Sequence, residues 1–432
     1  MNVFIAAAGS VLETERVVSF TLLQLLCILA GARLCGGVAR KLGQPRVVGE
    51  IVGGLLLGPS LFGRLFPAQF EFVFHSTPGL PLVILSQIGL TLLMFQIGLE
   101  FDFSHLRERQ NRRAMISISA VGIAVPFALG WWLGDVSHAA LAPDIQPLGY
   151  RLFLAVALSI TAIPILGRIM VELGISRTRL GAIAITAAAL DDVTGWTLLA
   201  LVSALTMAQF SAPDFFLKVG LLVAYFLFNL FVTRPLLRRL LDRYPPVNGQ
   251  LPHDILALLL GVIFVSGLIT FYLGVFVIFG GFIIGVLLHD RPEVVAAWKR
   301  SVAPFVTVFF LPIFFTFTGL RTNVNALDTP ALWGWCALLI GAATVGKFVG
   351  CAAAARWHGL SWPESGCIGI MMNTRALMEL IVINVGYELG VIPPSVFTML
   401  VLMAIFSTVV TSPCLRGWLA RMGHRTDLRP DV

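Results

Sequence analysis

The chain alternates long apolar stretches with short polar segments along its whole length. Several windows hold no Asp, Glu, Lys or Arg, among them 76–99, 193–213 and 389–415. Each is long enough for a membrane span, which needs about 20 apolar residues as a helix. The window 255–288 would be about 51 Å long as one helix, too long for a hydrocarbon core of about 30 Å. We therefore predict that this window forms two spans that turn near 272–274.

The same pattern predicts an all-α polytopic membrane protein with thirteen transmembrane helices and no inserted soluble domain. The expected spans are 17–37, 47–63, 80–101, 114–134, 150–170, 180–207, 216–236, 254–271, 274–289, 302–320, 330–355, 364–388 and 394–416. Thirteen spans divide naturally as six, one and six, and an offset of seven spans reverses the topology. The two groups of six can therefore be inverted repeats, a common transporter plan with the binding site near the bilayer midplane.

Composition and charge agree with a membrane protein and add its orientation. The chain is 57% hydrophobic and 12% charged, whereas a soluble domain carries about 25% charged residues. The net charge of +7 does not indicate a nucleic-acid partner, because the basic residues lie in short segments between apolar runs. With the N-terminus outside and the C-terminus in the cytoplasm, most of the 30 lysines and arginines lie in cytoplasmic segments, as the positive-inside rule requires. The six cysteines form no CxxC pair, so neither a disulfide framework nor a zinc site is expected.

Two adjacent carboxylates, Asp191 and Asp192, lie in the middle of the predicted span 180–207. If that helix starts near Leu180, Asp191 lies about 16 Å deep, close to the midplane of a core about 30 Å thick. Charged groups at this depth are costly and generally face a cavity or one another. Burial and mutual repulsion oppose full ionisation of both groups, so protons and cations can compete for the pair. The alternative is a purely structural ion pair.

Two basic residues are expected at a comparable depth. Lys347 lies about 13 Å from the cytoplasmic edge of its span, so it is too deep to reach the interface easily and one of the aspartates is its expected partner. Arg375 falls at the depth of the aspartates, and Glu379, four residues later, can pair with it on one helix face. Such a pair would be structural.

Two of the predicted spans carry residues that interrupt a helix. Thr161 lies near the midplane, and Pro164, which removes a backbone donor, follows it. Asn373 and Thr374 lie at the corresponding depth of a later span and suit an unwound segment opposite the first. Broken helices in transporters expose backbone carbonyls and helix ends to ions. For Pro164 the alternative is an ordinary proline kink.

Eight segments of the chain resemble the monovalent cation:proton antiporter-2 family. They are GEIVGGLLLGPS (49–60), LLMFQIGLEFD (92–102), SITAIPILGRIM (159–170), LDDVTGW (190–196), GGFIIGVLL (280–288), LPIFFTFTGL (311–320), GKFVG (346–350) and NTRALMELIVIN (373–384). They occur in order across nearly the whole chain. The resemblance implies an inverted-repeat sodium/proton antiporter fold with two broken helices, a homodimer, elevator-like alternating access and a place in the cytoplasmic membrane of a bacterium.

The resemblance also implies a division into a moving core and a dimerisation side. The expected parts are dimerisation-side helices at 1–110 and 246–325, core helices at 111–212 and 326–420, a linker helix at 213–245 and a short cytoplasmic tail at 421–432. The broken helices would be the one with Thr161 and Pro164 and the one with Asn373, Thr374 and Arg375.

Within this family the second residue of the acidic pair binds the ion and the proton, and that residue is Asp192 here. Asp191 resembles the residue that pairs with the deep lysine, which is Lys347 here. Members with two aspartates are similar to electrogenic sodium/proton antiporters, whereas the stretch NTRALMEL (373–380) resembles potassium-associated branches. The resemblance therefore leaves the choice of cation open.

Together these features predict a secondary antiporter, not an enzyme, that exchanges Na⁺ or alternatively K⁺ for protons. Asp192 would bind the cation with help from Asp191 and from backbone carbonyls near Thr161, and Lys347 would be released from Asp191 as a second proton-coupled switch. The alternatives are a potassium efflux protein with channel-like flux and a sodium-coupled solute symporter. Besides the cation and protons, the expected partners are membrane lipid and a second copy of the chain, without a cofactor or nucleic acid.

Overall fold

The computed structural model describes residues 2–422 with several gaps. The gaps are at residues 45, 77–78, 101–111, 162–165, 167–168, 171–172, 174, 176–177, 208–211, 248, 274–276 and 376. Regular structure in the described part of the chain is helical, and its β-type pairing is limited to an isolated bridge between Val247 and Gln250. The predicted all-α class is therefore confirmed.

The α-helices longer than four residues account for most of the described chain. They are α1 (Asn2–Lys41), α2 (Arg46–Leu57), α5 (Leu80–Glu100), α6 (Arg112–Leu141), α7 (Pro147–Ser159), α9 (Arg179–Met207), α10 (Ala212–Phe228), α11 (Arg234–Arg243), α12 (His253–Tyr272), α13 (Val277–Leu287), α14 (Pro292–Ser301), α16 (Leu311–Arg321), α17 (Pro330–Trp357), α18 (Trp362–Met372), α19 (Leu377–Glu388) and α20 (Pro394–Arg421). The first helix begins well before the predicted span 17–37, because the residues ahead of that span include an alanine run that favours helix.

Ten helical stretches of the described residues are long and apolar enough to cross a membrane. They are Leu12–Lys41, Val48–Leu65, Leu80–Leu99, Arg113–Leu141, Arg179–Ser203, Gly220–Arg243, His253–Tyr272, Ala303–Ala326, Pro330–Trp357 and Pro394–Arg421. Two further apolar helices, α7 and α13, are shorter. The window 255–288 holds two separate helices, α12 and α13, as its length requires. The total of thirteen spans stays a prediction.

The chain divides into two compact units. The first contains Met1–Gly98, Arg238–Gly267 and Val277–Asn325, and the second contains Leu99–Leu237, Leu268–Phe276 and Ala326–Val432. The first unit therefore includes α1, α2, α13, α14 and α16. The second includes α6, α7, α9 and α17–α20, together with every candidate ion-binding residue that the sequence analysis named.

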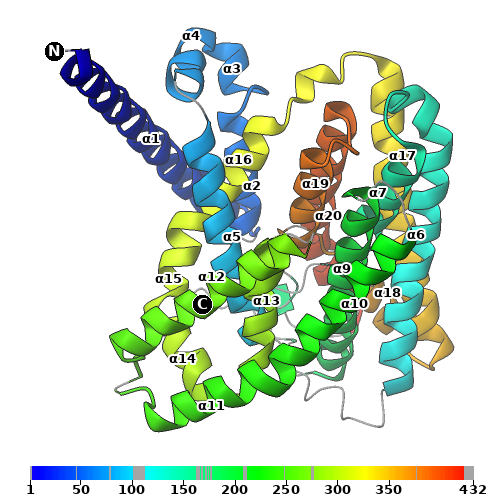
Figure 1. Cartoon of the computed structure of the whole chain (residues 1–432). Helices are drawn as coiled ribbons and strands as arrows, with labels where there is room; N and C mark the ends of the chain where they lie inside the picture. Colours follow the sequence, from blue (N-terminus) through cyan, green and yellow to red (C-terminus); the bar gives the residue numbers. More distant parts are fainter. Residues whose placement is uncertain are drawn as a thin grey trace. The chain divides into compact units, whose positions relative to one another are not determined.

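Helix backbones approach one another closely in the first unit. Here α2 packs against both α1 and α16 (Figure 1). A Cβ atom at Gly54 would lie 2.5 Å from the carbonyl oxygen of Phe315, and one at Gly58 would lie 2.4 Å from that of Gly319. Only glycine leaves room for so close a crossing, which is the usual way for membrane helices to approach one another.

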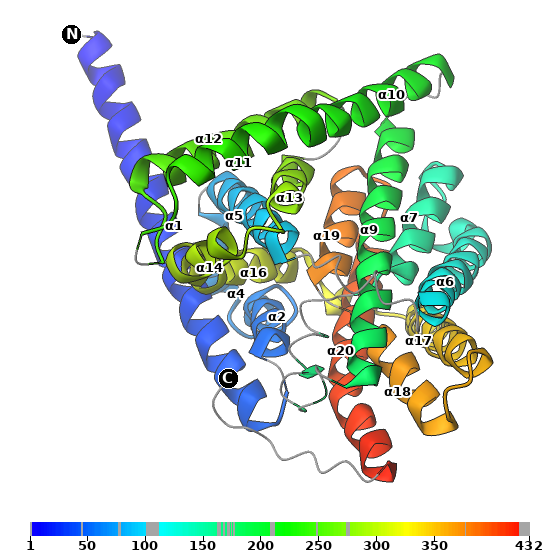
Figure 2. The same ribbon diagram turned by 90° about the horizontal axis from the view of Figure 1, so that it is seen from below.

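The second unit is a helix bundle that encloses the middle of α9. In this bundle α6 packs against α7, α9 and α17, while α17 also packs against α18 and α20 (Figure 2). Besides α6, the helix α9 contacts α7, α18 and α19. Because neighbours cover α9 on several sides, Asp191 and Asp192 in its centre are only 1% and 0% exposed.

Two helical segments of this bundle are interrupted. The helix α7 ends at Ser159, where Ile160 takes an extended conformation (φ −81°, ψ 146°). Pro164 lies outside the described residues, but in a continuous helix its ring would clash with the carbonyl of Ile160, one residue past the end of α7. The predicted span 364–388 contains α18 and α19, and the described residues 373–375 between them are not helical.

Candidate functional site

Among the described residues of the second unit, five charged side chains are fully buried. Asp191, Asp192, Lys347, Arg375 and Glu379 are each at most 1% exposed, and they are the buried Asp, Glu, Lys and Arg side chains among the described residues of that unit. They come from α9, from α17, and from the segment between α18 and the first turn of α19. The structure thus gathers residues that are up to 188 positions apart in the sequence.

Asp191 is held by donors from α6, from α17 and from the non-helical stretch that follows α7. Ser119 on α6 donates its hydroxyl hydrogen to Oδ1 of Asp191 at 2.6 Å. Lys347 donates to Oδ2 at 2.7 Å, and the hydroxyl of Thr161 lies 2.9 Å from the same oxygen. Charge-assisted hydrogen bonds of this kind compensate the cost of burying a carboxylate. Both oxygens of Asp191 therefore have partners.

Lys347 uses all three of its ammonium hydrogens. Besides Asp191, its Nζ lies 2.7 Å from the carbonyl oxygen of Gly122 and 2.5 Å from that of Ser159. The Ser159 carbonyl is one of the last in α7, and a helix end leaves such carbonyls without partners in the helix itself. Lys347 therefore connects α9, α6 and the broken end of α7.

Asp192 contrasts with its neighbour. Neither of its carboxylate oxygens has a hydrogen-bond partner among the described residues, although the side chain is 0% exposed. Successive side chains on a helix point about 100° apart because a turn takes about 3.6 residues, so Asp192 does not share the donors of Asp191. An ionised, unpartnered carboxylate in this setting is costly unless a proton or a cation neutralises it.

Arg375, in the interruption between α18 and α19, binds backbone carbonyl oxygens at the end of α7. Its guanidinium donates to the carbonyl oxygens of Ala157 at 2.9 Å and of Leu158, and it lies 3.4 Å from Oε2 of Glu379. The expected pair of Arg375 with Glu379 is therefore present, but backbone carbonyls are the closer partners. The other oxygen of Glu379, Oε1, is buried and has no partner among the described residues.

The interruption after α7 and the interruption after α18 come together at Thr161. Its hydroxyl lies 3.0 Å from the carbonyl oxygen of Met372, the last residue of α18, and 2.9 Å from Oδ2 of Asp191, so these two acceptors share its single hydrogen. Next to Met372, Asn373 is 2% exposed and its Oδ1 has no partner among the described residues. Thr374 lies 3.5 Å from the hydroxyl of Thr411 on α20. The segment therefore exposes side-chain and main-chain oxygens within the unit instead of forming helix.

Sequence reasoning did not find Ser119 and Gly122 on α6. Ser119 is one of several small polar residues in an apolar span, and nothing in its local pattern sets it apart. A Cβ atom at Gly122 would lie 2.6 Å from Sγ of Cys351 and 3.8 Å from Nζ of Lys347. Glycine at this position therefore lets α17 bring its lysine against the α6 backbone.

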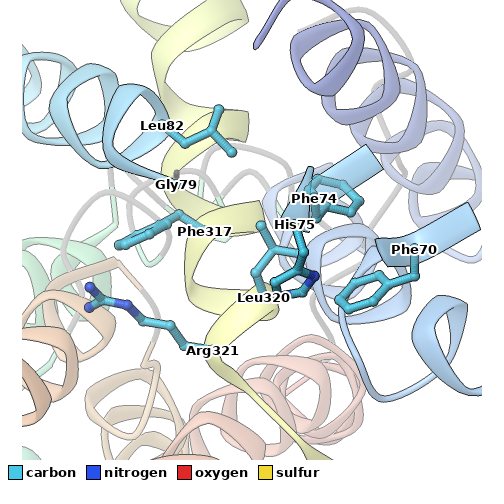
Figure 3. Close-up of a pocket in the computed structure, with 8 residues that line it drawn as sticks. All are labelled: Phe70, Phe74, His75, Gly79, Leu82, Phe317, Leu320 and Arg321. Atoms are coloured by element: carbon cyan, nitrogen blue, oxygen red, sulfur yellow. The ribbon is translucent and has the colours of Figure 1, made fainter. Parts of the chain in front are cut away.

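A separate pocket lies in the first unit. It has a volume of about 360 Å³ and is lined by Phe70, Phe74, His75, Gly79, Leu82, Phe317, Leu320 and Arg321. Figure 3 shows Phe70 and Phe74 on one side of it and Phe317 and Arg321 on the other. The Arg321 guanidinium carbon lies 4.0 Å from the centre of the Phe317 ring, a cation–π contact. None of the candidate ion-binding, charged or helix-breaking residues predicted from the sequence lines this pocket.

Comparison with known proteins identifies the family. The family described as sodium/hydrogen exchanger, transmembrane, matches residues 28–421. The chain is 38% identical over 394 residues to the Na⁺/H⁺ antiporter NhaS4 of Synechocystis sp., covering 91% of this chain and 95% of NhaS4. It is 36% identical over 404 residues to cation/H⁺ antiporter 17 of Arabidopsis thaliana, covering 92% of this chain and 48% of that protein, so it spans about half the length of this relative.

A solved structure shares the fold. The sodium proton antiporter MjNhaP1 from Methanocaldococcus jannaschii at pH 8 matches with a TM-score of 0.65 at 15% identity, covering 95% of this chain and 98% of that one. At this identity the likeness concerns the fold alone, whereas the match over residues 28–421 extends along nearly the whole chain. The chain therefore belongs to the sodium/hydrogen exchanger family, in agreement with the antiporter family that its sequence motifs predicted.

Proposed function

We propose that this protein is a secondary active antiporter that exchanges a monovalent cation for protons, with Asp192 as the group that binds each in turn. The contrast between two adjacent buried carboxylates carries this proposal. Asp191 has three donors, whereas Asp192 has no hydrogen-bond partner among the described residues. A cation and a proton each neutralise Asp192, and one carboxylate cannot hold both. Because the cation and the proton compete for the carboxylate of Asp192, binding of one requires release of the other. This coupling makes the transport an exchange.

Oxygen atoms near Asp192 would complete the coordination of the cation. Hard monovalent cations prefer carboxylate, carbonyl and hydroxyl oxygens. Such oxygens lie at the two interruptions. Oδ1 of Asn373 has no partner among the described residues, whereas the carbonyls at the ends of α7 and α18 already accept from Lys347, Arg375 or Thr161 and would bind a cation through their second lone pair. The sequence led us to expect that Asp191 helps to bind the cation and that Lys347 is released from it. Because both oxygens of Asp191 have donors, we propose instead that Asp191 and Lys347 form a fixed charge pair beside the cation. Arg375 with Glu379 would fix the helix ends around it.

Alternating access by an elevator-type movement is supported by the division of the chain. The whole charged cluster lies in the second unit, so that unit is the proposed moving core. The first unit, with its glycine-mediated crossing of α2 and α16, is the proposed dimerisation side. We place the protein in the cytoplasmic membrane of a bacterium, as a homodimer with its N-terminus outside and its C-terminus in the cytoplasm.

Sodium is the favoured cation in this proposal. The relative NhaS4, which the chain matches along most of its length, is named a Na⁺/H⁺ antiporter, and the two-aspartate motif LDDVTGW points the same way. The NTRALMEL stretch keeps K⁺ as the second possibility.

Exchange in proteoliposomes tests the proposal. Purified protein is reconstituted with a pH-sensitive dye inside, a pH gradient is imposed, and Na⁺, Li⁺, K⁺ or Rb⁺ is added. We expect cation-dependent proton movement in the wild type and its loss in Asp192→Asn. Asp135→Asn is the matched control, because Asp135 is a half-exposed partner of Arg151 in the same unit. Wild-type exchange rates in Asp192→Asn would refute the proposal, and flux without proton movement would favour a channel-like efflux protein.

A further inference from the structure

The two adjacent aspartates differ in the hydrogen bonds to their carboxylate oxygens, and one of the donors responsible lies on α6. Three donors converge on Asp191, but they are divided unequally between its two oxygens. Lys347 and Thr161 both serve Oδ2, whereas Ser119 alone serves Oδ1. The Ser119 hydroxyl is 2.6 Å from Oδ1, and the residue is 4% exposed, so water does not readily take its place.

The hydrogen bond from Ser119 also satisfies the oxygen of Asp191 that Lys347 and Thr161 do not reach. Because a carboxylate is planar, the donors at Oδ2 already limit its rotation about the bond to Cβ, and Ser119 restrains the same plane through Oδ1 from α6. Ser119 is therefore the donor that keeps Oδ1 occupied. Asp191 then stays directed at Lys347, and its second oxygen is not available to a cation beside Asp192.

We propose that Ser119 is a positioning residue that keeps Asp191 out of cation binding and thereby leaves Asp192 as the sole carrier. This inference rests on the proposed function, because it concerns the same site. It adds a residue on a helix that carries none of the charged groups of the site. Ser119 acts through Asp191 and does not itself touch the cation.

Loss of the Ser119 hydroxyl should strengthen cation binding and slow exchange. The Oδ1 atom of Asp191 becomes a buried oxygen without a donor, like the oxygens of Asp192. A cation at Asp192 then gains a second unsatisfied carboxylate oxygen in its surroundings, so it binds more tightly and leaves more slowly. The half-saturating cation concentration and the maximal exchange rate should therefore both fall. A substitution that only damages the site weakens cation binding and therefore raises the half-saturating cation concentration.

The experiment compares variants in proteoliposomes over a range of cation concentrations. In Ser119→Ala we expect the half-saturating concentration of the transported cation to fall by about tenfold or more, which is what loss of one charge-assisted hydrogen bond is worth. Ser119→Thr keeps the hydroxyl and should restore both quantities. Ser119→Cys keeps the volume but donates weakly, so it should resemble the alanine variant. Ser137→Ala is the matched control, since Ser137 is a buried serine of the same helix that pairs with Tyr150.

A second background tests whether Ser119 acts through Asp191. In Asp191→Asn the carboxylate is absent, so adding Ser119→Ala should leave the half-saturating concentration unchanged. The inference is overturned if Ser119→Ala raises that concentration or leaves it as in Ser137→Ala, or if its effect persists in the Asp191→Asn background. These outcomes differ from failure of the proposed function, in which the wild type itself exchanges no cation for protons.

Discussion

Replacing Gly122 by alanine would place a methyl group where α6 and α17 meet at the charged cluster. The new Cβ atom would lie 2.6 Å from Sγ of Cys351, 3.8 Å from Nζ of Lys347 and 3.9 Å from Oδ2 of Asp191. Real Cβ atoms do not approach a sulfur so closely, so α17 or the cysteine must move. Cys351 is 0% exposed, which leaves its side chain little room to turn away.

The expected cost follows from overpacking of a buried contact. Adding a methyl group to a packed interior costs about 1–3 kcal/mol, and the better helix propensity of alanine offsets up to about 1 kcal/mol of it. Gly334→Ala measures the propensity gain alone, because a Cβ atom at Gly334 of α17 meets nothing within 4 Å. Gly122→Ala should therefore melt at a lower temperature than Gly334→Ala in the same detergent, and its exchange rate should fall because Lys347 is displaced.

A double variant identifies the contact responsible. Cys351→Ala removes the sulfur atom, so Gly122→Ala combined with Cys351→Ala should melt at a higher temperature than Gly122→Ala alone, after correction for the effect of Cys351→Ala by itself. The assay is a thermal melt of purified protein followed by intrinsic fluorescence. Equal melting temperatures for Gly122→Ala and Gly334→Ala would refute the described approach of α17 to α6, as would failure of Cys351→Ala to relieve the defect.

Three further predictions concern the charged cluster and its surroundings. Lys347→Met should lower stability by about 3–5 kcal/mol, because it leaves the buried Asp191 without its cation, and adding Asp191→Asn should recover part of the loss in a thermal melt. Arg375→Lys should lower the melting temperature although it keeps the charge, since a lysine cannot spread its donors over the carbonyls at the end of α7 as a planar guanidinium does; an unchanged melting temperature would contradict this. Ser361→Ala should cost about 1 kcal/mol by removing the capping box at the start of α18 while leaving the half-saturating cation concentration unchanged in the exchange assay.

The central position of the aspartates and the helix-breaking chemistry were accessible from the sequence. Counting residues along an apolar span predicts that Asp191 and Asp192 lie in the middle of a helix, because a helix rises by a fixed amount per residue, and both are buried in the middle of α9. Asn373 and Thr374 are poor helix formers, and the chain does leave the helix at that point. Both inferences need only the local sequence and the thickness of a bilayer.

Contacts between helices were not accessible in this way. That Ser119 rather than another small polar residue reaches Asp191, and that Arg375 binds the carbonyls of Ala157 and Leu158 more closely than it binds Glu379, depends on how the helices pack. The sequence carries no period that marks such partners, since each of them lies more than 70 positions away along the chain apart from Glu379.

The proposed exchange depends on competition between a cation and a proton for Asp192, and counting protons during cation binding measures this competition most directly. Purified wild-type protein in weakly buffered detergent solution is titrated with Na⁺, and separately with K⁺, while released protons are recorded with a pH dye. We predict that binding of the preferred cation releases protons, that acidification weakens cation binding, and that Asp192→Asn shows neither binding nor release. Cation binding without proton release in the wild type, or undiminished binding and release in Asp192→Asn, would contradict the account.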